Sequence, residues 1–238
     1  MQKGSSLDSL ISTLKCSPIF KDVPEDILSD MSGKFEEFAY RKNDIIDYMQ
    51  TDRYSFVLAS GNFKMTRMDI QSGKSIALFL YECGDMFDLL PLLDGKEHDV
   101  EFLATANSVA LRTPIKQMRQ WIAEYPELNR AFFPYFADKM RELEEFSEEI
   151  AFCDTKTRLA QLILRHADSS CSLQDKPIPV KLINNLTHES LAELIGSVRS
   201  VVTTELSRLK QEGVIVGQRG SLAIKDLQKL KKKCRCLK

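Results

Sequence analysis

A short row of polar side chains is the part of this chain best equipped to recognise another molecule. Arg199, Ser200, Thr203 and Thr204 recur at spacings of one, three and four residues, which places them on one side of a helix. Their guanidinium and hydroxyl groups can hydrogen-bond base edges and phosphates. We therefore predict nucleic-acid recognition here, and no sequence motif for catalysis accompanies it.

Two short amphipathic helices joined by a tight turn must position this polar row, within residues 186–216. Thr187 can cap the first helix, and Gly196 lies at the turn, where a residue tolerant of positive φ is favoured. Ser197 can cap the second helix, residues 198–209. This arrangement predicts a helix-turn-helix whose second helix enters the major groove. An ordinary helical hairpin in a core is the alternative.

The second helix also needs an apolar side that packs on the rest of its domain. We expect that side to consist of Val198, Val201 or Val202, Leu206 and Leu209. A short hairpin that follows, residues 214–216 and 221–224, predicts the wing of a winged helix-turn-helix. The predicted DNA contacts are Thr187, Ser197, Arg199, Ser200, Thr203, Thr204, Arg208 and Arg219.

Basic and acidic residues are unevenly distributed along the chain. The 238 residues carry a formal net charge of −1, yet from Ala151 onward there are 16 Lys and Arg against 8 Asp and Glu. A basic back and an acidic front are typical of a sensor joined to a nucleic-acid binder, because phosphate contacts dominate affinity for nucleic acid. A merely solvated basic surface is the alternative.

Targeting signals are not evident in the sequence. No apolar run approaches the roughly 20 residues that a membrane span requires. The first ten residues lack the apolar segment of a signal peptide. We therefore expect a cytoplasmic protein whose six cysteines are reduced thiols.

The first half of the chain has the pattern of a small β domain. Two short amphipathic helices are predicted at 7–14 and 25–31, and short apolar runs follow from Phe35 to Thr113. Turn formers such as Ser60-Gly61-Asn62 separate these runs. Several short strands at this spacing predict an antiparallel roll or barrel.

After Pro114 the apolar residues recur every three or four positions, as in a helix. The apolar stripe is wider than packing against one neighbouring element requires. Part of this stripe has the a/d spacing of a coiled coil, so one side can pack on the roll while the seam pairs with a second copy. A single buried helix would also explain the stripe. The predicted dimerisation residues are Phe133, Phe136, Met140, Leu143 and Ile150.

The predicted fold class is α+β, with the elements in a fixed order. An N-terminal antiparallel β-roll at 1–126 is followed by a helix at 127–152 that dimerises. A C-terminal winged helix-turn-helix at 153–238 binds DNA, and Asp154 can cap its first helix.

This order of elements, over nearly the whole chain, resembles the CRP/FNR superfamily of bacterial transcription regulators. The residues most similar to that family are Leu186-Thr187, Leu191-Ala192, Ile195-Gly196, Arg199, 206–215, Cys16-Ser17-Pro18-Ile19-Phe20 and Ser60-Gly61. The resemblance implies that Arg199 contacts bases. Many members have Glu followed by Arg where this chain has Ser200 and Thr204, so the DNA target is expected to differ.

The resemblance also implies an effector pocket in the roll, for which the charge pattern argues against a cyclic nucleotide. Gly84-Asp85 keeps the start of the family's phosphate-binding cassette, but its end reads Glu97-His98-Asp99-Val100-Glu101. Three carboxylates would repel a phosphate, which needs a cation and hydrogen-bond donors. An uncharged, apolar or cationic effector is favoured. The predicted pocket residues are Gly84, Asp85, Met86, Phe87, His98 and Phe102.

Two cofactors known in the family find weak support. An N-terminal iron–sulfur cluster requires about four thiolates, and Cys16 is the one candidate there. Haem would need Cys83 or His98 as its axial ligand, and each residue has an ordinary packing or surface role as its alternative. Cys234 and Cys236 lie beside lysines that favour thiolate, so a redox role stays open. No metal site is predicted.

The sequence predicts a homodimeric, sequence-specific DNA-binding regulator that is not an enzyme. Its partners would be double-stranded DNA, an unidentified small-molecule or redox effector and, for an activator, RNA polymerase; no membrane partner is expected. One alternative is an effector-binding module that acts on a protein partner. Another is a redox or gas sensor based on thiols or haem.

Overall fold

The structure is a computed structural model that describes residues 7–46, 48–168, 177–217 and 221–235. The chain divides into two compact units, and each is described by itself. The first comprises residues 1–67 and 79–142, and the second comprises 68–78 and 143–238. The long helix α6, Pro126–Phe152, contributes to both units.

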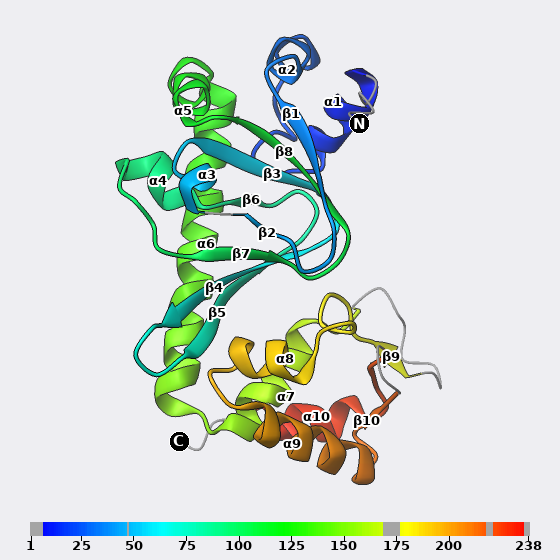
Figure 1. The fold of residues 1–238 in the computed structure, drawn as a ribbon. Helices are drawn as coiled ribbons and strands as arrows, with labels where there is room; N and C mark the ends of the chain where they lie inside the picture. Colours follow the sequence, from blue (N-terminus) through cyan, green and yellow to red (C-terminus); the bar gives the residue numbers. More distant parts are fainter. Residues whose placement is uncertain (1–6, 47, 169–176, 218–220, 236–238) are drawn as a thin grey trace. The chain divides into compact units, whose positions relative to one another are not determined.

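Two four-stranded sheets form the roll (Figure 1), in the orders β1-β8-β3-β6 and β2-β7-β4-β5. The strand pairs β1–β8, β3–β8 and β4–β7 are antiparallel. This confirms the predicted antiparallel roll. The bounds are β1 Glu36–Tyr40, β2 Ile45–Ile46, β3 Tyr54–Ser60, β4 Phe63–Asp69, β5 Lys74–Tyr81, β6 Met86–Phe87, β7 Glu101–Ala104 and β8 Ser108–Pro114.

Aromatic rings fill much of the roll. Phe87 lies at their centre and stacks on Phe56 and Phe63 with centroid distances of 5.1 and 5.6 Å. Phe102 and Tyr81 also contact Phe87, at 5.1 and 5.6 Å. Each such pair contributes about 0.5–1.5 kcal/mol beyond the burial of its surface. These rings therefore hold strands from both sheets together.

A second apolar core lies where four helices pack against the roll. Leu14, Leu28, Met118 and Phe132 are fully buried in one core cluster, and each comes from a different helix. The bounds of these helices are α1 Leu7–Lys15, α2 Glu25–Ser32, α5 Ile115–Glu124 and α6 as given above. The core thus joins the start of the chain to the beginning of α6.

Two short helices inside the roll were not predicted from the sequence. They are α3, Tyr48–Thr51, and α4, Leu89–Asp94. The helix α4 is bounded by left-handed residues, Asp88 with φ of 56° and Gly95 with φ of 73°. Helices of four to six residues have too little periodicity to separate them from strands, so tertiary context decides them.

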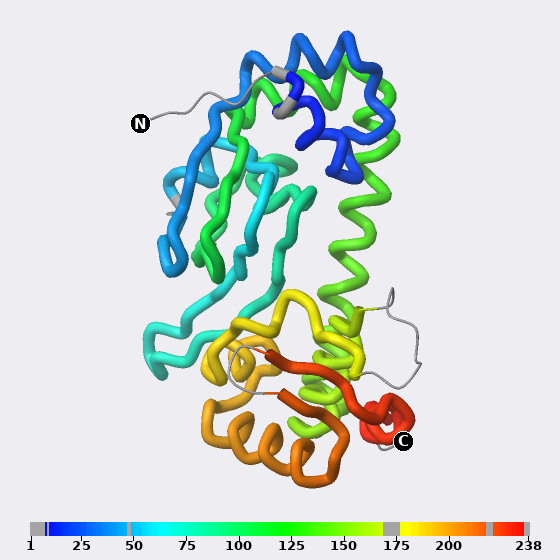
Figure 2. Tube along the Cα trace, turned by 90° about the vertical axis from the view of Figure 1, so that its right-hand side faces the viewer, coloured from blue at the N-terminus to red at the C-terminus, as the bar shows by residue number. Residues whose placement is uncertain are grey.

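Besides the end of α6, the second unit contains the four helices α7–α10 and a small sheet among its described residues (Figure 2). Asp154 caps α7 by accepting a hydrogen bond from the Thr157 backbone N–H, as predicted. The strands β10 and β11 pair as the predicted hairpin, and β9 extends it. The bounds are α7 Thr155–Arg165, β9 Ile178–Pro179, α8 His188–Leu194, α9 Arg199–Gln211, β10 Ile215–Val216, β11 Ala223–Ile224 and α10 Leu227–Lys233.

Over the described part of the chain, no helix is long and apolar enough to cross a membrane.

Candidate nucleic-acid interface

The turn between α8 and α9 has the geometry of a helix-turn-helix. The Thr187 hydroxyl accepts the Ser190 backbone N–H at 3.1 Å and so caps α8. Gly196 follows α8 with a φ of +57°, a conformation that side chains with a Cβ rarely adopt. A Cβ there would also lie 2.6 Å from Cδ1 of Ile150. The backbone conformation therefore favours glycine at the turn, and the Ile150 side chain would have to shift for any larger residue.

The recognition helix begins later than predicted, and Ser197 does not cap it. Val198 is the N-cap residue, in extended conformation with φ −119° and ψ 150°, and no side chain caps α9. The Ser197 backbone N–H bonds back to the Ala192 carbonyl at 2.8 Å. The chain therefore needs one further extended residue before Arg199 can open the helix.

The predicted polar row lies on the exposed side of α9. Arg199, Ser200, Thr203 and Thr204 are all exposed. The Thr203 and Thr204 hydroxyls donate to the carbonyls of Arg199 and Ser200, at 2.8 and 3.0 Å. These bonds fix the hydroxyl orientation and leave oxygen lone pairs as acceptors. The row therefore presents both donors and acceptors on one helix face.

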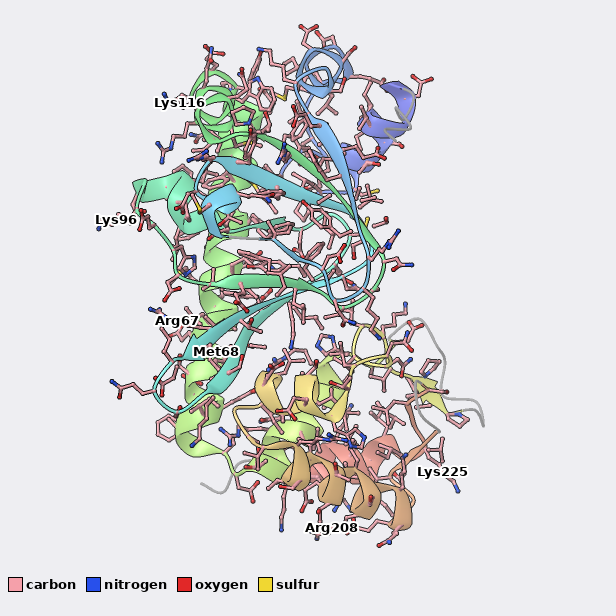
Figure 3. All side chains as sticks on the ribbon, viewed as in Figure 1. Arg67, Met68, Lys96, Lys116, Arg208 and Lys225 are labelled. Carbon is pink, nitrogen blue, oxygen red and sulfur yellow. The ribbon has the colours of Figure 1, made fainter. Side chains whose placement is uncertain are left out.

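The two arginines of α9 differ in their surroundings. Within the described chain, the Arg199 guanidinium makes no ion pair or side-chain hydrogen bond. Arg208 (labelled in Figure 3) is held by two acids, Glu212 at 2.8 Å and Glu205 at 3.7 Å. The hydrogen bond to Glu212 raises the pKa of Arg208 further. Arg199 is therefore free to bind DNA, whereas Arg208 must first leave its partners.

The apolar side of α9 is narrower than predicted. Val202, Leu206 and Leu209 are buried, but Val198 is 51% exposed and Val201 is 36% exposed. The later start of the helix accounts for Val198, which stays outside it. Val201 lies one residue before the buried stripe begins at Val202. The two valines thus add apolar surface beside the polar row.

Sequence reasoning missed His188. Its Nδ1 lies 2.8 Å from the Thr203 hydroxyl, so it joins the start of α8 to α9. A histidine at the first position of a helix carries no signal for such a contact, because its partner is decided by how the helices cross. The predicted wing contact Arg219 lies outside the described residues.

The predicted dimerisation residues are unevenly exposed along α6. Phe133 is 55% exposed, Met140 47% and Ile150 38%, which is unusual for large apolar side chains. Phe136 and Leu143 are partly buried, and Phe136 also packs against the core. Part of the stripe thus serves the roll, and part presents apolar surface to solvent.

The predicted effector residues fall into two groups. Met86, Phe87 and Phe102 are fully buried within the packed interior of the roll. Gly84 has a φ of +94°, and a Cβ there would lie 2.6 Å from the Cys16 carbonyl oxygen, so only glycine fits. These residues build the frame of the roll.

Asp85 and His98 are the polar members of the predicted effector set, and each has its own partner. Asp85 accepts a hydrogen bond from Tyr135 at 3.0 Å. His98 Nδ1 lies 2.7 Å from the buried Asp88 carboxylate. No interaction joins Asp85 to His98 among the described side chains.

The cysteines correct two expectations. Cys153, at the junction of α6 and α7, is disulfide-bonded, whereas all six were expected as reduced thiols. Cys16, Cys83 and Cys234 are free. Burial, followed by the charge of Glu149, raises the pKa of Cys234 to about 11, which disfavours the thiolate expected beside lysines. Cys236 lies outside the described residues.

An α8–turn–α9 unit with an exposed polar face, followed by the β10–β11 hairpin, defines a winged helix-turn-helix DNA-binding protein. The second unit has this architecture. The roll and α6 precede it in the chain.

Comparisons with known proteins agree with that class. Residues 157–233 match the family model of the Crp-like helix-turn-helix domain. The global nitrogen regulator of Synechocystis sp. is 27% identical over 164 residues, which cover 67% of this chain and 71% of that protein. A CRP-like cAMP-activated global transcriptional regulator of Mycobacterium tuberculosis is 23% identical over 180 residues, covering 76% of this chain and 79% of that protein.

A solved structure gives the same result for the fold. A variant of CooA from Carboxydothermus hydrogenoformans aligns with a TM-score of 0.70 and 25% identity, covering 85% of this chain and 89% of that one. Residues 157–233 thus form a Crp-like helix-turn-helix domain, and most of the chain is similar to transcription regulators of the CRP/FNR superfamily. The protein is a DNA-binding transcription regulator of that type.

Proposed function

We propose that the protein acts as a homodimer in which two α9 helices read two half-sites of one operator. The observation that carries this proposal is the exposed row Arg199, Ser200, Thr203 and Thr204, with Arg199 unpaired in the described structure. An arginine so placed can donate two hydrogen bonds to O6 and N7 of a guanine. The Thr203 and Thr204 hydroxyls, whose hydrogens go to backbone carbonyls, suit donors on adjacent base edges.

The exposed apolar side chains of α6 support the dimer. Phe133 and Met140 lie seven residues apart, the repeat of a coiled-coil seam, and about half of each side chain is exposed. Pairing with a second copy would remove that surface from water. Two-fold symmetry then requires an operator with two half-sites about one helical turn apart.

The domain roles follow from this assignment. Residues 1–126 would sense the effector, 127–152 would dimerise, and 153–238 would bind DNA. A transcription regulator works on cytoplasmic DNA, needs no catalytic site, and would contact RNA polymerase if it activates.

Cyclic AMP is a poor candidate for the effector, although the relative from Mycobacterium tuberculosis is named as cAMP-activated. The Asp88 carboxylate is 1% exposed and lies beside His98, at the end of the expected phosphate cassette. Further carboxylates lie close by, since burial and then the charge of Glu97 raise the pKa of Asp52. A phosphate would meet repulsion here.

The test of this proposal is operator selection with the full-length protein from random duplex DNA. We expect an enriched sequence with two related half-sites, and a dimer by sedimentation. Calorimetry with cyclic AMP should show no binding and no gain in operator affinity. Failure to enrich any sequence would contradict the proposal.

A further inference from the structure

The carboxylate of Asp85 is fully engaged inside the first unit. Its Oδ2 accepts the Glu82 backbone N–H at 2.9 Å. Its Oδ1 lies 3.0 Å from the Tyr135 hydroxyl and 3.3 Å from Nζ of Lys139. The Tyr135 hydroxyl also accepts the Met86 backbone N–H at 3.0 Å, and its one hydrogen is shared between Asp85 and the Met86 carbonyl, which lies 2.8 Å away. The roll and α6 are therefore joined by one polar network.

The ammonium group of Lys139 is enclosed on several sides. Its side chain is only 14% exposed, as is unusual for lysine. Nζ lies 5.7 Å from the ring centroid of Tyr81 and 5.5 Å from that of Tyr135, within the range of cation–π attraction. Glu142 approaches it at 3.1 Å. Two acids and two aromatic rings thus form a cage for a primary ammonium ion.

Lys96, a lysine elsewhere in the first unit, has no such surroundings. Lys96 (labelled in Figure 3) pairs with Asp94 at 3.7 Å, and its side chain is 83% exposed. An exposed pair of that kind contributes little, about 0–1 kcal/mol. The enclosure of Lys139 is therefore a property of its cage, made by Asp85, Tyr81, Tyr135 and Glu142.

We propose that Lys139 is an internal ligand of the roll, and that its contacts to the roll support operator binding without an added effector. An effector controls such a protein only by favouring one arrangement over another. Here the ammonium of α6 itself makes the contacts to the roll. The same cage would accept a primary alkylammonium ion as the external ligand whenever Lys139 is displaced. This inference rests on the proposed regulation of DNA binding through the roll.

The experiment truncates the lysine and adds the missing atoms as a free molecule. Lys139→Ala removes every side-chain atom beyond Cβ, and n-propylammonium has the same three carbons and ammonium group. We expect operator affinity to fall about tenfold, within the usual range of coupling between sites. Millimolar n-propylammonium chloride should restore it saturably, and calorimetry should detect its binding to the variant but not to the wild type.

Matched controls separate the cage from general effects. Lys96→Ala should bind operator like the wild type. Propan-1-ol, which lacks charge, and tetramethylammonium, which is too broad and lacks N–H donors, should not restore Lys139→Ala. Lys139→Met keeps an apolar stem that fills the site, so its affinity should fall without rescue. If Lys139→Ala fails to fold by circular dichroism, Lys139→Met decides the question.

Two outcomes would overturn the inference: operator affinity in Lys139→Ala and Lys139→Met equal to that of the wild type, or restoration by tetramethylammonium as good as that by n-propylammonium. Failure of the proposed function looks different, because the wild type itself would then show no preference for any operator.

Discussion

The recognition helix α9 and the cage around Lys139 both contain charged and hydroxyl side chains. These side chains are paired with one another in the cage, whereas on α9 they are exposed to solvent. Where the roll meets α6, Asp85 bonds both Tyr135 and Lys139, and Asp85 and Tyr135 also bond the backbone. On α9, Arg199 has no side-chain partner among the described residues, and the polar row faces solvent.

This difference separates a structural contact from a binding surface. Polar groups that hydrogen-bond one another pay only a small free-energy cost for burial, and their bonds hold together the strands and helices that carry them. Polar groups left open on a rigid helix keep their hydrogen-bonding capacity for another molecule. Composition alone does not distinguish the two states, because both regions contain similar residue types.

The largest expected effect concerns the open apolar surface of α6. Met140→Asp would place a carboxylate in the seam, where desolvation strongly disfavours it. We expect monomers by sedimentation and operator affinity reduced about 10³-fold, to the non-specific level. Met68→Asp is the control, because Met68 is similarly exposed, at 53% against 47%. A Met140→Asp protein that remains dimeric would show that the seam lies elsewhere.

The next prediction tests whether Arg199, which has no side-chain partner among the described residues, reads a base. Arg199→Ala should cost about 1–3 kcal/mol per half-site and relax the preference at one base pair. Arg208→Ala should cost less, because Arg208 is already paired with Glu205 and Glu212. Competition binding against operators with single base changes measures both variants. Uniform weakening on all sequences would make Arg199 a phosphate contact.

A buried group in the second unit gives an expected pH dependence. Burial, and then Arg165, lowers the pKa of His166 from 6.5 to about 4. The unfolded chain therefore binds the proton more readily than the folded chain. The contribution of neutral His166 to stability is fully present above pH 6.5 and is lost as the pH falls towards 4. The free energy of unfolding should fall by about 2–3 kcal/mol over that window. Urea unfolding of His166→Gln, which stays neutral, should show a weaker dependence; equal curves would contradict the assignment.

The smallest effect tests the valines beside the polar row. A thymine methyl group against Val201 would bury about one methyl, worth about 0.8 kcal/mol or roughly fourfold in affinity. Replacing each operator thymine in turn by uracil should reveal one position per half-site with that loss. In Val201→Ala, the affinity lost on replacing thymine by uracil at that position should be smaller. In the control variant Val198→Ala, it should be the same as in the wild type. No methyl-sensitive position would exclude this contact.

The sequence predicted the elements that carry strong local signals. The amphipathic helices, the caps Thr187 and Asp154, and the turn at Gly196 were readable because each follows from propensity or periodicity. The short helices α3 and α4 were not, since four to six residues show too little period.

The details of both sites depend on contacts that are distant in sequence. The extended Val198, which delays α9, follows from how the turn bonds back to Ala192. The pairing of Asp85 with Lys139 joins a strand end to a helix, and no spacing rule links them. The disulfide of Cys153 was likewise missed, because composition and compartment favoured reduced thiols.

The most direct test of the central claim is the ratio of affinities for the selected operator and for a random duplex, measured over a salt series without added ligand. We predict a ratio of about 10³ or more, with affinity falling at a log–log slope of about −0.9 per phosphate neutralised. A ratio near one at every salt concentration would contradict the account.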